Sequence, residues 1–306
     1  MSKPQFHNLF DKQVAGDGER VLVTLLRGLG PWRDSVFLVG GLAPAYIVRR
    51  RHPQVPIHAG TGDVDVVVDL AMLADTEAYQ TLEKNLKTMG FERGENDSGQ
   101  AVNWRWKMKM EHGGVLVLEF LADDPKLRGG KIRELPTAGN VSAVNIPYAS
   151  MVFDLHDTIE IKAELLGGGG LTTQTIAYAN IVSFTCLKAF AFDHRNERKD
   201  AHDLVYCLEN IEGGVEAAVQ AFIKALTGIH RDPILKALRL LRQHFAPDPD
   251  EGYRYSGPVA VAMFELTDAD DMREERLLRQ RIASDVIARL LSGLAEHIGE
   301  HSDEAI

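Results

Sequence analysis

The run DVDVVVDL, residues 63–70, constrains the fold of this 306-residue chain more than any other stretch. Its valines are β-branched and predict a buried strand, yet Asp63 and Asp65 stand at the head of that strand. Residues two apart in a strand face the same side, so the two carboxylates lie about 6–7 Å apart at Cα. Two ionised carboxylates this close repel each other unless a cation lies between them. The run therefore predicts a divalent cation site.

Oxygen ligands from short acids suit Mg²⁺ or Mn²⁺, and two such metals need a third acid. Glu119 is the best candidate, because it is a lone carboxylate in the apolar run VLVLEFLA. Asp123 and Asp124, just after that run, are alternatives. An Asp-x-Asp pair alone is not specific, and Asp63 and Asp65 could equally lie in solvent at a strand end.

Two glycines, Gly40 and Gly41, separate a short apolar strand, SVFLV, from a helix predicted at 42–51 with Pro44 in its first turn. Backbone N–H groups at such a helix start can receive a phosphate. The glycines could also form a plain strand–helix turn. A phosphate cradle followed by a carboxylate pair on the next strand is the layout of nucleotidyl transfer. Many phosphatases and glycosyltransferases instead place their Asp-x-Asp after a hydrophobic strand.

Strict alternation of apolar and polar residues predicts further strands. In NWRWKMKM, Trp104 and Met108 share one face of a strand, while Arg105 and Lys107 share the other. The turn EHGG then leads to VLVLEFLA as the partner strand of a hairpin. A second hairpin is predicted at 158–178, where TIEIKAEL and LTTQTIAY flank a turn of four glycines.

Helical periodicity dominates the remainder of the chain. Helices are predicted at 15–30 and near 75–89, and Asn180 is a good N-cap after which the chain becomes mostly helical. The change in composition there predicts a nucleotidyltransferase domain at 1–179 and a helical C-terminal domain at 180–306. The predicted fold class is α+β: a nucleotidyltransferase-fold mixed sheet with flanking helices, followed by the helical domain.

Composition narrows the classes of function. The net charge of −10 argues against a long electrostatic contact with duplex DNA. No apolar run reaches the roughly 18–20 residues that a membrane helix needs, and the polar N-terminus lacks the apolar core of a signal peptide. The two cysteines, Cys186 and Cys207, stand among apolar residues and are expected to be reduced. These features predict a cytoplasmic protein.

The run VGGLAPAYIVRRR…GTGDVDVVVD resembles the opening motif of the polymerase-beta-like nucleotidyltransferase superfamily. A Ser or Thr often stands two residues before the first Asp of that motif, and Thr61 fills this place. A second run, LKAFAFDHRNERKDAHDL, is similar to the signature of the AbiEii/AbiGii toxin-type nucleotidyltransferases. Its matching positions are Lys188, Arg195, Arg198, Lys199, Asp200 and Asp203.

The resemblance implies transfer of a nucleoside monophosphate from an NTP to an acceptor, with Mg²⁺ or Mn²⁺ held by Asp63, Asp65 and Glu119. It implies that Lys188 neutralises the triphosphate and that Asp200 positions the acceptor or Lys188. Gly40, Gly41 and Thr61 would line the nucleotide site. The acceptor could be tRNA, another RNA or a protein. A role as the toxin of a type IV toxin–antitoxin or abortive-infection system would add a cognate antitoxin as partner.

Two alternatives stay open. An aminoglycoside-type nucleotidyltransferase would modify a small molecule, and an acidic acceptor pocket would favour it. A non-catalytic nucleotide-binding or partner-binding module would have a degenerate site without a third carboxylate. The pair HD at 202–203 matches part of a metal phosphohydrolase motif, but the sequence offers no obvious further ligands for it.

Overall fold

The computed structural model describes residues 12–49, 58, 63–76, 81–110, 114–245, 250–266 and 270–298. These residues divide into two compact units, each with its own interior. The described part of the first unit comprises residues 12–46 and 63–179. The described part of the second comprises residues 47–49 and 58 and those that follow Ala179. Thr61, Arg50 and Arg51 lie outside the described residues.

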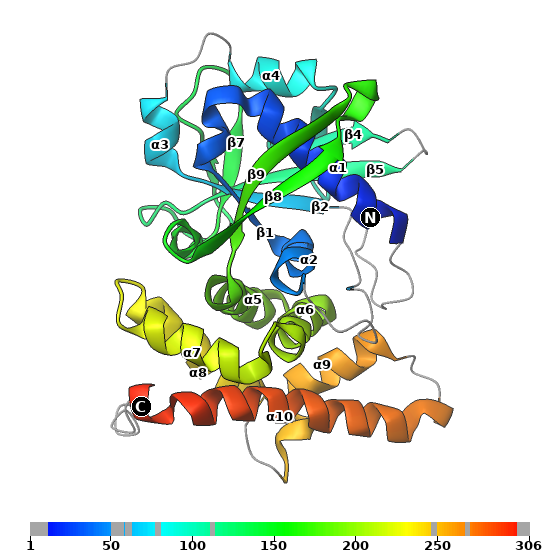
Figure 1. Cartoon of the computed structure of the whole chain (residues 1–306), viewed down its shortest axis with the longest axis vertical. Coiled ribbons are helices and arrows are strands. Elements are labelled where there is room, and N and C mark those ends of the chain that lie inside the picture. Colours follow the sequence, from blue (N-terminus) through cyan, green and yellow to red (C-terminus); the bar gives the residue numbers. More distant parts are fainter. Residues whose placement is uncertain are drawn as a thin grey trace. The chain divides into compact units, whose positions relative to one another are not determined.

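Nine described strands of the first unit form one mixed sheet in the order β3-β4-β5-β2-β1-β9-β8, with β6 and β7 paired beside β5 (Figure 1). Most neighbours are antiparallel, but β2 runs parallel to β5, β1 parallel to β9 and β5 parallel to β7. The strands are β1 Val36–Val39, β2 Asp63–Val68, β3 Glu92–Glu95, β4 Ala101–Lys109, β5 Val115–Ala122, β6 Ile132–Glu134, β7 Ser142–Asn145, β8 His156–Glu164 and β9 Leu171–Ala179.

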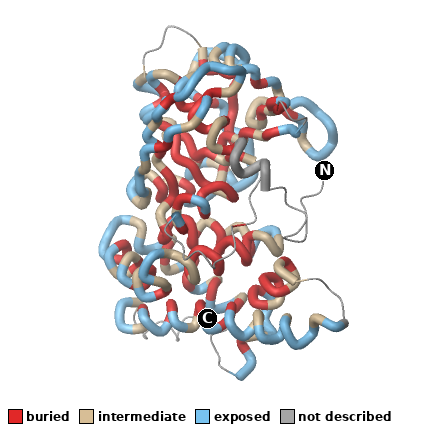
Figure 2. Tube along the Cα trace, turned by 45° about the vertical axis from the view of Figure 1, so that its right-hand side comes forward, coloured by how far each residue is buried: buried red, intermediate tan, exposed pale blue. Residues whose placement is uncertain are grey.

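Helices of the first unit flank this sheet, and the predicted α+β class is confirmed. α1 packs on β8 and β9. Its apolar residues at helical spacing are all buried: Val21, Leu22, Leu25, Leu26 and Leu29. Figure 2 shows buried residues running through the strands and the facing turns of helices. The helices are α1 Lys12–Leu29, α2 Pro44–Ile47, α3 Leu70–Asp75 and α4 Leu82–Thr88.

Both predicted hairpins are confirmed as the pairs β4–β5 and β8–β9. The single helix predicted near 75–89 is wrong, because Thr76, which ends α3, and Thr81, which precedes α4, both have extended backbones. The Asp69 side chain accepts hydrogen bonds from the first backbone N–H groups of α3, and Thr81 accepts one from Lys84 at the start of α4. The described helix within 42–51 is only the single turn of α2.

The second unit is helical in its described residues. The Asn180 side chain caps α5 by accepting from the N–H groups of Val182 and Ser183, which confirms the predicted cap. The chain breaks within the run DHRNER, residues 193–198, where Asn196 adopts a left-handed conformation between α5 and α6. The helices are α5 Ile181–Arg195, α6 Arg198–Asn210, α7 Gly214–Leu226, α8 Arg231–Phe245, α9 Ser256–Glu265 and α10 Arg273–Ile298.

Cys186 on α5 and Cys207 on α6 are both free thiols and both buried, as predicted. Burial raises the thiol pKa of each cysteine above its ordinary value. Among the helices that the structure describes, none combines the length and the apolar character needed to cross a membrane.

Candidate functional site

The register of the sheet places the three predicted acids on one face. β2 and β5 run parallel, with Asp65 opposite Glu119 and Asp63 opposite Val117. Side chains paired in this way point to the same side, so Asp63, Asp65 and Glu119 form one group, here called the carboxylate cluster. All three are partly exposed, whereas Val64 between the aspartates is buried.

Gly40 lies directly beneath the Asp65 carboxylate. Its φ of +67° is in the left-handed region, and a Cβ at this position would lie 1.9 Å from Oδ2 of Asp65. Any other residue would meet both backbone strain and a clash with the carboxylate. Gly40 and Gly41 open a short 3-10 turn, Gly40–Leu42, and the helix after it has one turn. The helix dipole at these glycines is therefore small, because few peptide units align.

Glu119 has a cationic neighbour that sequence reasoning missed. Arg105 of β4 stands directly opposite Glu119, and its Nε donates a hydrogen bond to Oε1 at 2.7 Å. Another guanidinium nitrogen donates to the backbone carbonyl of Glu95 at 2.9 Å, and the group lies 4.6 Å from the centre of the Trp104 ring. The alternation of β4 predicted the face of Arg105, but only the register of the hairpin shows which acid it meets.

The chemistry of the carboxylate cluster fits a hard divalent cation. Asp63, Asp65 and Glu119 offer only oxygen donors, which Mg²⁺ and Mn²⁺ prefer. The Arg105 guanidinium is a cationic neighbour of Glu119 within this cluster.

The second predicted group forms a buried ion network in the second unit. Lys188 is 7% exposed and donates to Asp200 at 2.9 Å and to Asp203 at 2.7 Å. Arg195 adds two hydrogen bonds to Asp200, and Lys199 contacts Asp203 at 2.8 Å. Burial alone would lower the pKa of Lys188, but the two aspartates raise it above its ordinary value. Lys188 is therefore a charged group neutralised within this unit.

His58 also belongs to this network, and sequence reasoning gave no sign of it. Its Nε2 lies 2.7 Å from Oδ1 of Asp203, and both side chains are buried. Burial is the largest cause of a lowered His58 pKa of about 3, so the imidazole is neutral at pH 7. Because Asp203 is an ionised acceptor, Nε2 is the nitrogen that carries the proton.

His58, His202 and Asp203 lie close enough to be considered as metal ligands, with donor atoms within 4.8 Å of one another. Two ammonium groups, those of Lys188 and Lys199, contact the same Asp203 carboxylate. They would repel a metal cation in a buried site, where charges are weakly screened. The geometry therefore favours a hydrogen-bonded network over a metal centre.

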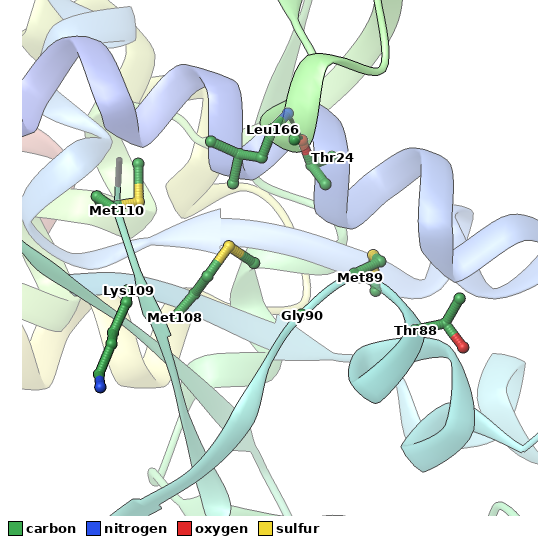
Figure 3. A pocket seen from close by; sticks show the side chains of 9 residues that line it. Thr24, Thr88, Met89, Gly90, Met108, Lys109, Met110 and Leu166 are labelled. Carbon is green, nitrogen blue, oxygen red and sulfur yellow. Dashed lines mark hydrogen bonds between the residues drawn. The ribbon is translucent and has the colours of Figure 1, made fainter. Parts of the chain in front are cut away.

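A cavity of about 490 Å³ in the first unit is lined by Met89, Met108 and Met110 (Figure 3). Lys107 of β4 pairs with Val117, and Val117 pairs with Asp63, so Lys107 and Asp63 point to the same face of the sheet. Met108 follows Lys107 in the strand and therefore points to the face opposite the carboxylate cluster. Lys109, which also lines the cavity, is at the end of β4, and no predicted site residue lines the cavity.

Comparison of the chain with protein-family models, curated proteins and solved structures finds no match. The carboxylate cluster and the ion network therefore carry the functional argument through their own chemistry. The first unit brings together Asp63, Asp65, Glu119 and Gly40, and the second brings together Lys188, Asp200 and Asp203.

Proposed function

We propose that the protein is a metal-dependent nucleotidyltransferase that moves a nucleoside monophosphate from an NTP to an acceptor and releases pyrophosphate. The observation that carries this proposal is the carboxylate cluster, with Asp65 and Glu119 side by side on parallel strands and Gly40 beneath Asp65. Three carboxylates gathered on one face repel one another, and a divalent cation bound between them would offset that repulsion.

In this proposal, Asp63, Asp65 and Glu119 hold Mg²⁺ or Mn²⁺. Divalent cations supply charge neutralisation for a triphosphate and lower the pKa of an attacking hydroxyl. The two aspartates fix the cation at the head of β2. The resemblance of the motifs to AbiEii/AbiGii toxin-type enzymes supports a toxin-like role. On that resemblance the acceptor would be tRNA, another RNA or a protein, with an antitoxin as partner.

The contribution of the second motif to nucleotide binding stays a prediction. Lys188 and Asp200 contact each other in the ion network, and Asp203 is the second anion on Lys188. The proposed chemistry at the carboxylate cluster does not depend on either Lys188 or Asp200 meeting the triphosphate.

The double variant Asp63→Asn/Asp65→Asn tests the proposal. We expect the Mg²⁺-dependent stabilisation by NTP to be lost and metal-free thermal stability to rise, because the repulsion between the carboxylates is removed. Thermal denaturation with each NTP, with and without Mg²⁺, measures both effects. The control Asp157→Asn/Glu160→Gln removes the same charge from exposed positions of β8.

Transfer itself is measured with each labelled NTP, Mg²⁺ and either total RNA or cell extract. Label that becomes attached to an acceptor with the wild type and not with the double variant supports an enzyme. Binding of NTP without transfer to any acceptor would favour the non-catalytic module. Equal stabilisation of wild type and double variant by Mg²⁺ and NTP would contradict the site.

A further inference from the structure

A row of three charged residues crosses the sheet on the face that carries the carboxylate cluster. Arg105 stands opposite Glu119, and Glu119 stands opposite Asp65. Glycines leave space for the two end members of this row: a Cβ at Gly94 would lie 2.8 Å from Cγ of Arg105, and one at Gly40, which follows the strand partner of Asp65, would lie 1.9 Å from Oδ2 of Asp65. At each end, a charged side chain occupies the space that a larger residue would need.

We propose that Arg105 is a positioning residue that orients the Glu119 carboxylate toward the metal held by the carboxylate cluster. This inference rests on the proposed function. It concerns a residue of β4 that has no place in the Asp-x-Asp motif and that contacts Glu119 rather than the metal or the substrate.

The Arg105 side chain is fixed by contacts that do not involve Glu119. It donates to the Glu95 carbonyl at 2.9 Å, lies over the Trp104 ring and fits the space left by Gly94. The pairing of β3 with β4 shifts register between Arg93 and Glu95, at Gly94. The guanidinium is thus preorganised, and Glu119 meets a donor that is already in place.

The Nε of Arg105 donates to Oε1 of Glu119 at 2.7 Å. A carboxylate has two oxygens with several lone pairs, so a hydrogen bond from an arginine is compatible with coordination of a cation. A glutamate side chain has several rotatable bonds, so such a hydrogen bond lowers the conformational cost of ligation. The opposing effect is repulsion between Arg105 and the metal. Arg105 is 25% exposed, so solvent screens that repulsion.

Direct binding of Mn²⁺, followed by electron paramagnetic resonance or calorimetry, tests the inference without an activity assay. We expect Arg105→Met to weaken Mn²⁺ binding about 10- to 100-fold, as for other partners that orient ligands. The control Lys107→Met removes a cation from the same face of the same strand, where it contacts Glu95, and should bind Mn²⁺ like the wild type. In a Glu119→Gln background, Arg105→Met should cause no further loss.

Several results would overturn the inference. One is Mn²⁺ binding by Arg105→Met that equals or exceeds that of the wild type; another is an equal loss in the presence and absence of Glu119. If Arg105→Met does not fold, as judged by circular dichroism, Arg105→Gln carries the same comparison. If the wild type binds no Mn²⁺, the proposed function and this inference are both overturned. If the wild type binds Mn²⁺ and Arg105→Met binds it equally well, the inference alone is overturned.

Discussion

Gly40 and Gly30 both have a left-handed backbone. At Gly40 the Asp65 carboxylate occupies the space that a Cβ would need, whereas no described atom beyond its chain neighbours lies within 4 Å of a Cβ built at Gly30. Both Gly40→Ala and Gly30→Ala should lose about 1–2 kcal/mol of stability from the positive φ alone. Gly40→Ala should also displace Asp65 and abolish metal-dependent NTP binding, whereas Gly30→Ala should keep it. Thermal denaturation and Mn²⁺ titration of the two variants separate the effects. Wild-type metal binding by Gly40→Ala would contradict the described position of Asp65.

At the residue scale, the sequence is informative where local periodicity decides geometry. Asp63 and Asp65 share a face because a strand alternates, and Glu119 was recognised as a charge in an apolar strand. Arg105 and His58 were missed as site residues because their partners are set by strand register and by tertiary packing. Nothing in the residues around His58 indicates that it meets an aspartate 145 positions later.

At the element scale, the ion network joins α5 to α6 through Lys188, which contacts two aspartates of the neighbouring helix. Lys188→Met should cost about 3–5 kcal/mol, because it leaves buried carboxylates with one cation fewer. Lys87→Met breaks an exposed pair with Glu83 on α4 and should change stability by no more than about 0.5 kcal/mol. Denaturant unfolding of both variants measures the difference, and equal small losses would show that the network adds little stability.

Strands with strict apolar–polar alternation and helices with a strong N-cap residue could be predicted from the sequence. Helices that begin at a weaker N-cap residue could not. The hairpins β4–β5 and β8–β9 combine alternating strands with glycine turns, which are local signals. The prediction of one helix near 75–89 was wrong because Thr81 caps a separate helix. Its side chain accepts a hydrogen bond from the N–H of Lys84, and the sequence alone does not show whether a threonine makes this contact. No helix or strand identifies the proposed metal or the acceptor.

The stability of the molecule should fall as the pH is lowered from 7 to 5. The pKa of His58 is about 3 in the folded state, whereas an unfolded histidine has an ordinary pKa of about 6.5. Below about pH 6.5, His58 therefore binds a proton in the unfolded chain but not in the folded chain. The free energy of unfolding then falls by up to about 1.4 kcal/mol for each pH unit. The expected loss from pH 7 to pH 5 is about 2 kcal/mol.

Urea unfolding at several pH values checks this slope. His58→Gln keeps an N–H donor for Asp203 and does not titrate, so its stability should depend less on pH in this range. Acids with lowered pKa values, such as Glu265 at about 2, add their own losses only at lower pH. An equally steep slope in His58→Gln would show that another group takes up the proton.

The two buried thiols offer a built-in probe of motion. Cys186 and Cys207 lie on α5 and α6, and their raised pKa values keep them protonated and unreactive toward alkylating reagents at neutral pH. Both belong to the second unit, so the rate at which iodoacetamide modifies the native protein reports transient opening of that unit. Without any added label, the rate of thiol modification therefore measures how often the interior of this unit opens to solvent.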